Sequence, residues 1–134
     1  MTHQLINPEA LGAPKGYSNG VLCEPGGRLL FVAGQVGWDD KEQIVSERFS
    51  EQFGRAIQNV ATVLEAAGGK PEHVTRLTIF VSDKDEYVAQ SREVGAQYRR
   101  VMGKHFPAMS LIQIAALLEE GAKVEIEATA VIPA

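Results

Sequence analysis

The residues best suited to chemistry in this chain are a glutamate in an alternating stretch and three residues able to line a ligand cleft. Glu125 carries a carboxylate that can orient or deprotonate a water molecule. Its alternative role is a polar strand face, paired with Lys123 or with an arginine. Tyr17 suits stacking on a ligand or hydrogen bonding to it, and it equally suits a half-buried position that closes the N-terminal segment onto a sheet. Gly34 either exposes backbone to a ligand or only ends a strand. Met109 offers a polarisable apolar surface and no hydrogen-bond donor.

The sequence shows no residue pattern that other common chemistries need. The histidines at 3, 73 and 105 are far apart and show no metal-ligand spacing, so we expect no metal. Cys23 is interpreted as a small core residue, because no basic neighbour that would activate a thiol is placed by the sequence. Neither a phosphate-binding glycine loop nor a nucleophile elbow is present. We therefore expect no cofactor.

Composition predicts one globular domain over residues 1–134. Hydrophobic residues make up 45% of the chain and charged residues 22%. The net charge of -4 argues against nucleic acid as a partner, because phosphate binding relies on a cationic face. A lone cysteine, the lack of a secretory signal and the lack of an apolar stretch of about 18 residues lead us to expect a cytoplasmic protein with no membrane partner.

Hydrophobic periodicity predicts two helices. The clearer one covers residues 49–67, where apolar side chains recur at helical spacing until Gly68-Gly69 ends the pattern. The second begins at Asp83, where Glu86 completes a capping-box-like start, and Gly103 is its expected stop.

Five strands complete the pattern. Residues 21–23 and 29–33 flank a Pro-Gly-Gly turn and predict a β-hairpin. Further strands are expected at 74–81, 110–116 and 123–132. The order ββαβαββ predicts an α+β sheet with two helices on one face. The hairpin and the strands at 74–81 and 110–116 carry apolar residues on both faces, which favours burial of the second face by another chain and hence an oligomer.

Several motifs resemble those of the RidA (YjgF) family, in the same order and at compatible spacing. Tyr17-Ser18 is similar to its Gly-Pro-Tyr-Ser, and residues 33–35 to its Ser-Gly-Gln. Pro107-Ala108 and the stretch 124–128 (Val-Glu-Ile-Glu-Ala) are similar to its C-terminal signature. Gln52, the run 58–60 and the run 78–81 resemble its first helix and central strand. The resemblance implies a chorismate-mutase-like fold, a homotrimer with clefts between subunits, and hydrolysis of enamines or imines without a cofactor.

The resemblance also implies a site. The family's cleft joins an arginine after Pro-Ala, backbone at the Ser-Gly-Gln glycine, an aromatic ring from the N-terminal segment and the first glutamate of Glu-Ile-Glu. On this chain these become Met109, Gly34, Tyr17 and Glu125. The family's asparagine of the second helix has Gly95 near its position.

Methionine in place of the family's arginine removes the donors that would hold a substrate carboxylate. A charge-assisted hydrogen bond contributes roughly 1.5–3 kcal/mol, so binding of a 2-imino acid should weaken greatly. Either the cleft accepts an uncharged or more apolar ligand, which we favour, or another cation replaces the arginine. The candidate cations, of either subunit, are Arg28, Arg92, Arg99 and His105.

Three functions remain open from the sequence. The first is an enamine or imine deaminase-like hydrolase in which Glu125 orients the water. The second is a non-catalytic trimer that binds or senses a small, fairly apolar metabolite, as Met109 suggests. The third is RNA cleavage, a label that some family members carry, and the acidic net charge disfavours it.

Overall fold

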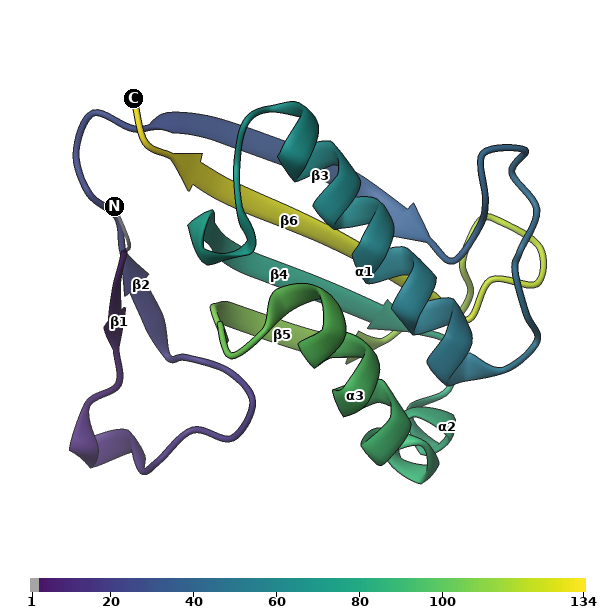
Figure 1. Cartoon of the computed structure of the whole chain (residues 1–134). Helices are drawn as coiled ribbons and strands as arrows, with labels where there is room; N and C mark the ends of the chain where they lie inside the picture. Colours follow the sequence, from purple (N-terminus) through teal and green to yellow (C-terminus); the bar gives the residue numbers. More distant parts are fainter. Residues whose placement is uncertain (1–2) are drawn as a thin grey trace.

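The computed structural model describes residues 3–134 and shows a four-stranded sheet with helices on one face and a two-stranded ribbon beside it (Figure 1). In chain order the elements are β1 (Gln4–Ile6), the 3-10 helix η1 (Glu9–Leu11), β2 (Gly20–Leu22), β3 (Arg28–Val36), α1 (Phe49–Ala66), the 3-10 helix η2 (Pro71–His73), β4 (Val74–Val81), α2 (Lys84–Ala89), α3 (Ser91–Met102), β5 (Ala108–Gln113) and β6 (Val124–Ile132). Among these described residues, no helix has the length and apolarity needed to cross a membrane.

Helix α1 packs on the sheet because one of its faces is apolar. Phe49, Phe53, Ile57, Val60 and Leu64 recur every three or four residues, and each is almost fully buried. The helix ends where Gly68 adopts the left-handed conformation, with φ 83°. The predicted helix at 49–67 is therefore confirmed to within one residue.

The strand order in the main sheet is β3-β6-β4-β5. Strand β6 is antiparallel to both of its neighbours, whereas β4 and β5 are parallel and are joined by a crossover through α2 and α3. The predicted alternation of β6 is confirmed, because the alternate residues Val124, Ile126, Ala128 and Ala130 are buried in the core. The α+β class is likewise confirmed.

The predicted hairpin between residues 21–23 and 29–33 is wrong. Strand β2 pairs with β1, and β3 pairs with β6, nearly a hundred residues further along the chain. The physical reason lies in burial. Val32 of β3 is only 4% exposed and belongs to the main core, and β3 reaches that core by lying beside β6 under α1. The local turn signal carried no information about that distant partner.

The predicted second helix is divided in two. Gln90 ends α2 and precedes α3, with φ -108° and ψ 21°. Its side-chain oxygen accepts a hydrogen bond from the backbone N–H of Ser50 at 2.9 Å, which ties the break to the first turn of α1. The Asp83 cap is confirmed, since its carboxylate accepts from the N–H of Asp85 at 2.9 Å.

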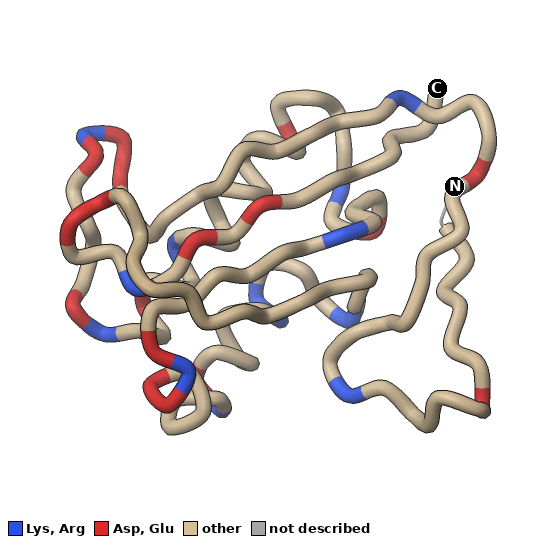
Figure 2. The backbone as a smooth tube through the Cα atoms, turned by 180° about the vertical axis from the view of Figure 1, so that it is seen from behind, with Lys and Arg blue, Asp and Glu red and all other residues tan. Residues whose placement is uncertain are grey.

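The sheet face away from the helices carries exposed apolar side chains. Leu29 is 60% exposed, Phe31 72% and Ile112 44%. The charged residues gather mainly in the loops at one end of the sheet, and its strands carry few (Figure 2). The prediction of apolar residues on both faces is confirmed, and this open face is suited to burial against another chain.

Candidate functional site

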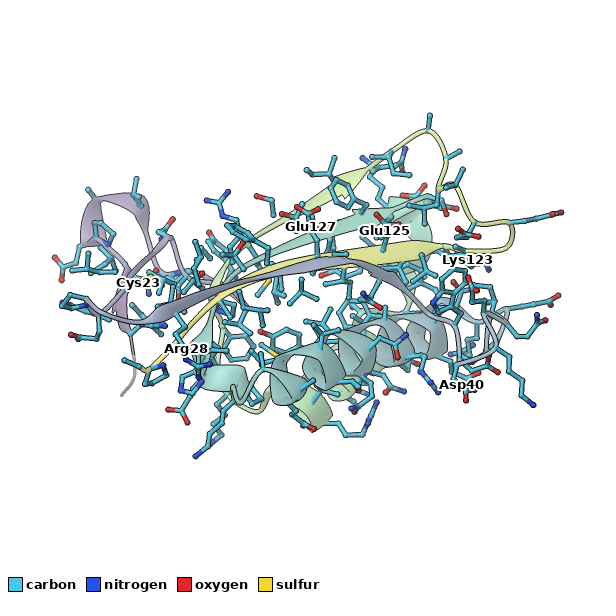
Figure 3. The ribbon with its side chains drawn as sticks, turned by 90° about the horizontal axis from the view of Figure 1, so that it is seen from above. Cys23, Arg28, Asp40, Lys123, Glu125 and Glu127 are labelled. Atoms are coloured by element: carbon cyan, nitrogen blue, oxygen red, sulfur yellow. The ribbon has the colours of Figure 1, made fainter. Side chains whose placement is uncertain are left out.

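Glu125 projects from β6 on the open face, away from the helices (Figure 3). Within residues 3–134 its carboxylate forms neither a hydrogen bond nor an ion pair. Lys123, the partner that the sequence offered, is bonded elsewhere, with its Nζ 2.7 Å from Oε2 of Glu86. The half-buried Glu125 carboxylate is therefore available to accept a proton or a hydrogen bond from a ligand or a water.

Gly34 lies directly beneath this carboxylate. Strand β3 has a register shift between Val32 and Gln35, and Gly34 lies within it. A Cβ atom added to Gly34 would lie 2.7 Å from Cδ of Glu125 and 2.9 Å from its Cγ, which is closer than real Cβ contacts. Glycine thus lets the Glu125 side chain lie flat against the β3 backbone, and the structure brings these two predicted site residues together.

Gln52 fixes the start of the strand that carries Glu125. Its side chain is fully buried on α1. The Nε2 group donates to the carbonyls of Ser46 at 2.9 Å and Gly121 at 3.0 Å, and Oε1 accepts from the N–H of Lys123 at 2.8 Å. The backbone two residues before Glu125 is therefore held to the first helix.

Met109 faces the other side of the sheet. It pairs with Leu77, a fully buried residue of β4, and its side chain packs against the main core. There it helps to line a cavity of about 330 Å³ between β5 and α3. The lining residues are Gly16, Phe53, Ile79, Tyr87, Ser91, Val94, Gly95, Tyr98, Arg99, Phe106 and Met109.

Tyr17 directly follows Gly16, which lines this cavity, and it is 38% exposed. Its neighbour Ser18 anchors the N-terminal segment beside β5. The Ser18 N–H donates to the Pro107 carbonyl at 3.0 Å, and its hydroxyl donates to the Phe106 carbonyl at 2.6 Å. The predicted residues Tyr17 and Met109 are thus grouped at the β5 edge of the sheet.

The predicted residues Glu125 and Met109 therefore lie on opposite faces of the sheet within one protomer. Glu125 pairs with Phe80, whereas Met109 pairs with Leu77, three residues earlier on the same strand β4. Because side chains alternate between faces along a strand, residues 77 and 80 point in opposite directions. A single protomer therefore does not bring Glu125 and Gly34 to the cavity beside Met109.

The aromatic wall of the cavity was not found from the sequence. Tyr98 stacks on Phe106 with ring centroids 5.4 Å apart and planes 10° apart. The Tyr98 hydroxyl donates to the His105 carbonyl at 2.6 Å, and burial raises the pKa of this phenol. Its polar atom is therefore occupied, and Tyr98 presents an apolar ring. The helical spacing of Val94 and Tyr98 was visible in the sequence, but it is typical of any core-facing helix.

The four candidate cations lie in different parts of the structure. Arg28 lies near the end of α1, where its Nη1 is 3.5 Å from the Ala67 carbonyl. His105 has its Nε2 2.7 Å from the Val74 carbonyl. Arg92 is not among the residues that line the cavity, whereas Arg99 is. For metals, residues 3–134 contain no group of three or more histidine, cysteine, aspartate or glutamate side chains placed to hold an ion.

The fold places this protein among the chorismate-mutase-like α+β proteins of the YjgF type. The chain of the Rid family protein YyfB from Yersinia pestis superposes with a TM-score of 0.86 at 32% identity, covering 98% of this chain and all of that one. Curated relatives include the 2-iminobutanoate/2-iminopropanoate deaminase of Homo sapiens, 32% identical over 92% of this chain and 85% of that protein. The deaminase of the same name from Salmonella typhimurium is 34% identical over 92% and 91%.

A family model described as Endoribonuclease L-PSP matches residues 7–132. The chain belongs to this family, which the names of its relatives also identify as the RidA/YjgF family.

Proposed function

We propose that the protein is a cofactor-independent hydrolase of reactive enamines and imines, acting in a cleft between the protomers of a homotrimer. The observation that carries the proposal is the Glu125 carboxylate, which lies against Gly34 on an uncovered face and has no partner among residues 3–134. The names of the human and Salmonella relatives, which describe deaminases of small 2-imino acids, support the same reaction class.

The open sheet face supports the assembly. It exposes Leu29, Phe31 and Ile112, and burial of such side chains stabilises an interface by about 25 cal/mol per Å². Packing this face on the β5 edge of a second copy would place Glu125 of one protomer next to Met109 and Tyr17 of its neighbour. The number of three subunits in this proposal comes from the resemblance to the RidA family.

The chemistry needs one water and one carboxylate. Glu125 takes a proton from water while the water oxygen forms a bond to the imine carbon. Glu125 returns that proton to the imine nitrogen, which gives a neutral carbinolamine. Transfer of the carbinolamine hydroxyl proton to the nitrogen then forms the carbonyl group, the C–N bond breaks, and ammonia leaves. The net reaction converts an imine and water into a carbonyl compound and ammonia. The Gly34 backbone holds the ligand at the carboxylate.

Substitution of Glu125 tests this directly. An amino-acid oxidase generates the imine in place, and release of the carbonyl compound is followed above the spontaneous rate. We expect Glu125→Gln to lower kcat/KM by roughly 10²–10⁴-fold, the usual contribution of a positioned general base. The matched control is Glu127→Gln, an exposed glutamate two residues along the same strand and on the same face. Equal activity of both variants, or an inactive wild-type protein across substrates with and without a carboxylate, would refute the hydrolase.

A binding or sensing role is the second candidate, and the apolar cavity beside Met109 favours it. On that hypothesis neutral ligands stabilise the assembly in thermal-shift measurements and 2-oxo acids do not. Met109→Arg separates the two candidates. A gain of imino-acid hydrolysis in the variant shows that the rest of the site is intact, whereas tighter acid binding without turnover supports the sensor.

The endoribonuclease description of the family model has less support on this chain. The net charge is -4, and the strands of the open sheet face carry few cationic residues (Figure 2). Binding of an RNA backbone relies on a cationic surface.

A further inference from the structure

Arg99 is the one charged side chain among the described residues that line the cavity beside Met109. Its guanidinium folds back over Gly95, one helical turn earlier on α3. A Cβ atom added to Gly95 would lie 3.2 Å from Nη1 of Arg99 and 3.9 Å from its Cζ. The absence of a side chain at residue 95 therefore leaves the space that the guanidinium occupies at the cavity wall.

The Arg99 guanidinium has no protein acceptor within residues 3–134. The arginine that follows it is engaged, since Arg100 donates to Oε1 of Gln97 at 3.0 Å and lies 3.5 Å from the Gly54 carbonyl. Arg48 pairs with Glu93 at 3.7 Å. Arg99 alone of these three presents a planar fork of unpaired donors beside an apolar hollow, an arrangement that matches the two oxygens of a carboxylate.

The remaining walls of the cavity are mostly apolar. Phe53, Ile79, Phe106 and Met109 contribute hydrocarbon, ring or thioether surface, and the Tyr98 hydroxyl is occupied by the His105 carbonyl. The volume of about 330 Å³ falls in the range of small-molecule pockets. A ligand that fills it needs a sizeable apolar group next to its anionic group.

We propose that Arg99 binds the carboxylate of a 2-imino acid whose aromatic or branched aliphatic side chain fills the cavity beside Met109. That the ligand carries an imine group rests on the proposed function. The carboxylate anchor thus lies on helix α3 rather than on β5, and Met109 becomes part of the surface that selects the substrate side chain. The uncharged ligand that the sequence favoured is replaced by an amphipathic acid.

Binding measurements by calorimetry test the anchor without any need for turnover. The probes are phenylpyruvate, a stable 2-oxo acid; phenylacetone, which lacks the carboxylate; and pyruvate, which lacks the ring. Phenylpyruvate should bind the wild-type protein at least tenfold more tightly than either of the others. Arg99→Gln should weaken phenylpyruvate binding by roughly 10- to 100-fold and leave phenylacetone unchanged. The matched control Arg92→Gln removes the same charge from the same helix and should change neither.

Gly95→Ala gives a second, independent test. The added Cβ should displace the Arg99 guanidinium and weaken phenylpyruvate binding, while the alanine raises the melting temperature because it favours helix. Unchanged phenylpyruvate binding in Arg99→Gln, or equal wild-type affinity for phenylacetone, would overturn the Arg99 assignment. Either result leaves the hydrolase standing if Glu125→Gln is inactive. Loss of phenylpyruvate binding in Arg99→Gln supports the anchor whatever the Glu125 assay shows.

Discussion

Gly34→Ala is expected to impair catalysis while leaving the fold intact. An alanine Cβ would lie 2.7 Å from Cδ of Glu125, and ordinary contact begins at 3.4 Å, so the carboxylate must move by at least about 0.7 Å. A misplacement of about 1 Å at a reacting group can reduce the rate by about 10²-fold, or about 2.7 kcal/mol in the activation barrier. The backbone at Gly34 does not adopt the left-handed conformation, so alanine is not strained there.

The assay is kcat/KM for ketone release from an imine generated in place, together with the melting temperature of each variant. Gly20→Ala is the matched control, because Gly20 also lies in a strand and its added Cβ would meet Ile6 at an ordinary 3.6 Å. We expect Gly34→Ala to lose about 100-fold in kcat/KM and Gly20→Ala to retain wild-type activity. Wild-type activity in Gly34→Ala, alongside an inactive Glu125→Gln, would refute the argument that contact with β3 positions the carboxylate.

Four further predictions concern stability and assembly. Gly95→Ala should raise the free energy of unfolding by about 1 kcal/mol, measured by denaturant titration, because glycine is the poorer helix former. Burial lowers the pKa of His73 from its ordinary value of 6.5, so the unfolded chain takes up this proton first as the pH falls. The contribution of His73 is full above pH 6.5 and is lost as the pH falls toward and below its folded pKa, so His73→Gln should lose less stability than the wild type between pH 7.5 and pH 5. Phe31→Asp should shift the assembly toward monomer in light scattering, whereas Leu11→Asp, at a similarly exposed position outside the main sheet, should not. Gln52→Leu should destabilise the protein by about 3 kcal/mol, seen in denaturant titration, because three backbone groups lose the part-buried hydrogen bonds that they make to the Gln52 side chain.

The sequence predicted best the elements whose periodicity is strong. The helix at 49–67 and the strand at 74–81 were correct almost to the residue, because both bury a continuous apolar face. The pairing of β3 was missed, since strand partners are chosen by the whole core and not by the nearest turn. The break at Gln90 was missed because it depends on a hydrogen bond to Ser50, forty residues earlier in the chain.

The candidate site shows the same limit. Alternation within β6 was enough to predict that Glu125 lies on the sheet face away from the buried residues of that strand. The side of the sheet on which Met109 lies required the register between β5 and β4, which no local pattern contains. Arg99 was one of four candidate cations, and its position at the cavity wall, with its guanidinium over Gly95, became visible only in the structure.

The separation of the two halves of the site constrains how activity can arise. Gly34 and Glu125, which we propose for proton transfer, lie together on one face, whereas Met109 and Arg99, which we propose for ligand binding, line the cavity on the other. Strand alternation forbids a small rearrangement from uniting them, because rotating β6 to turn Glu125 toward the helices would expose the buried Ile126. Under the proposed function, catalysis therefore depends on association of two copies, and Phe31→Asp should abolish turnover without any change at Glu125 or Gly34.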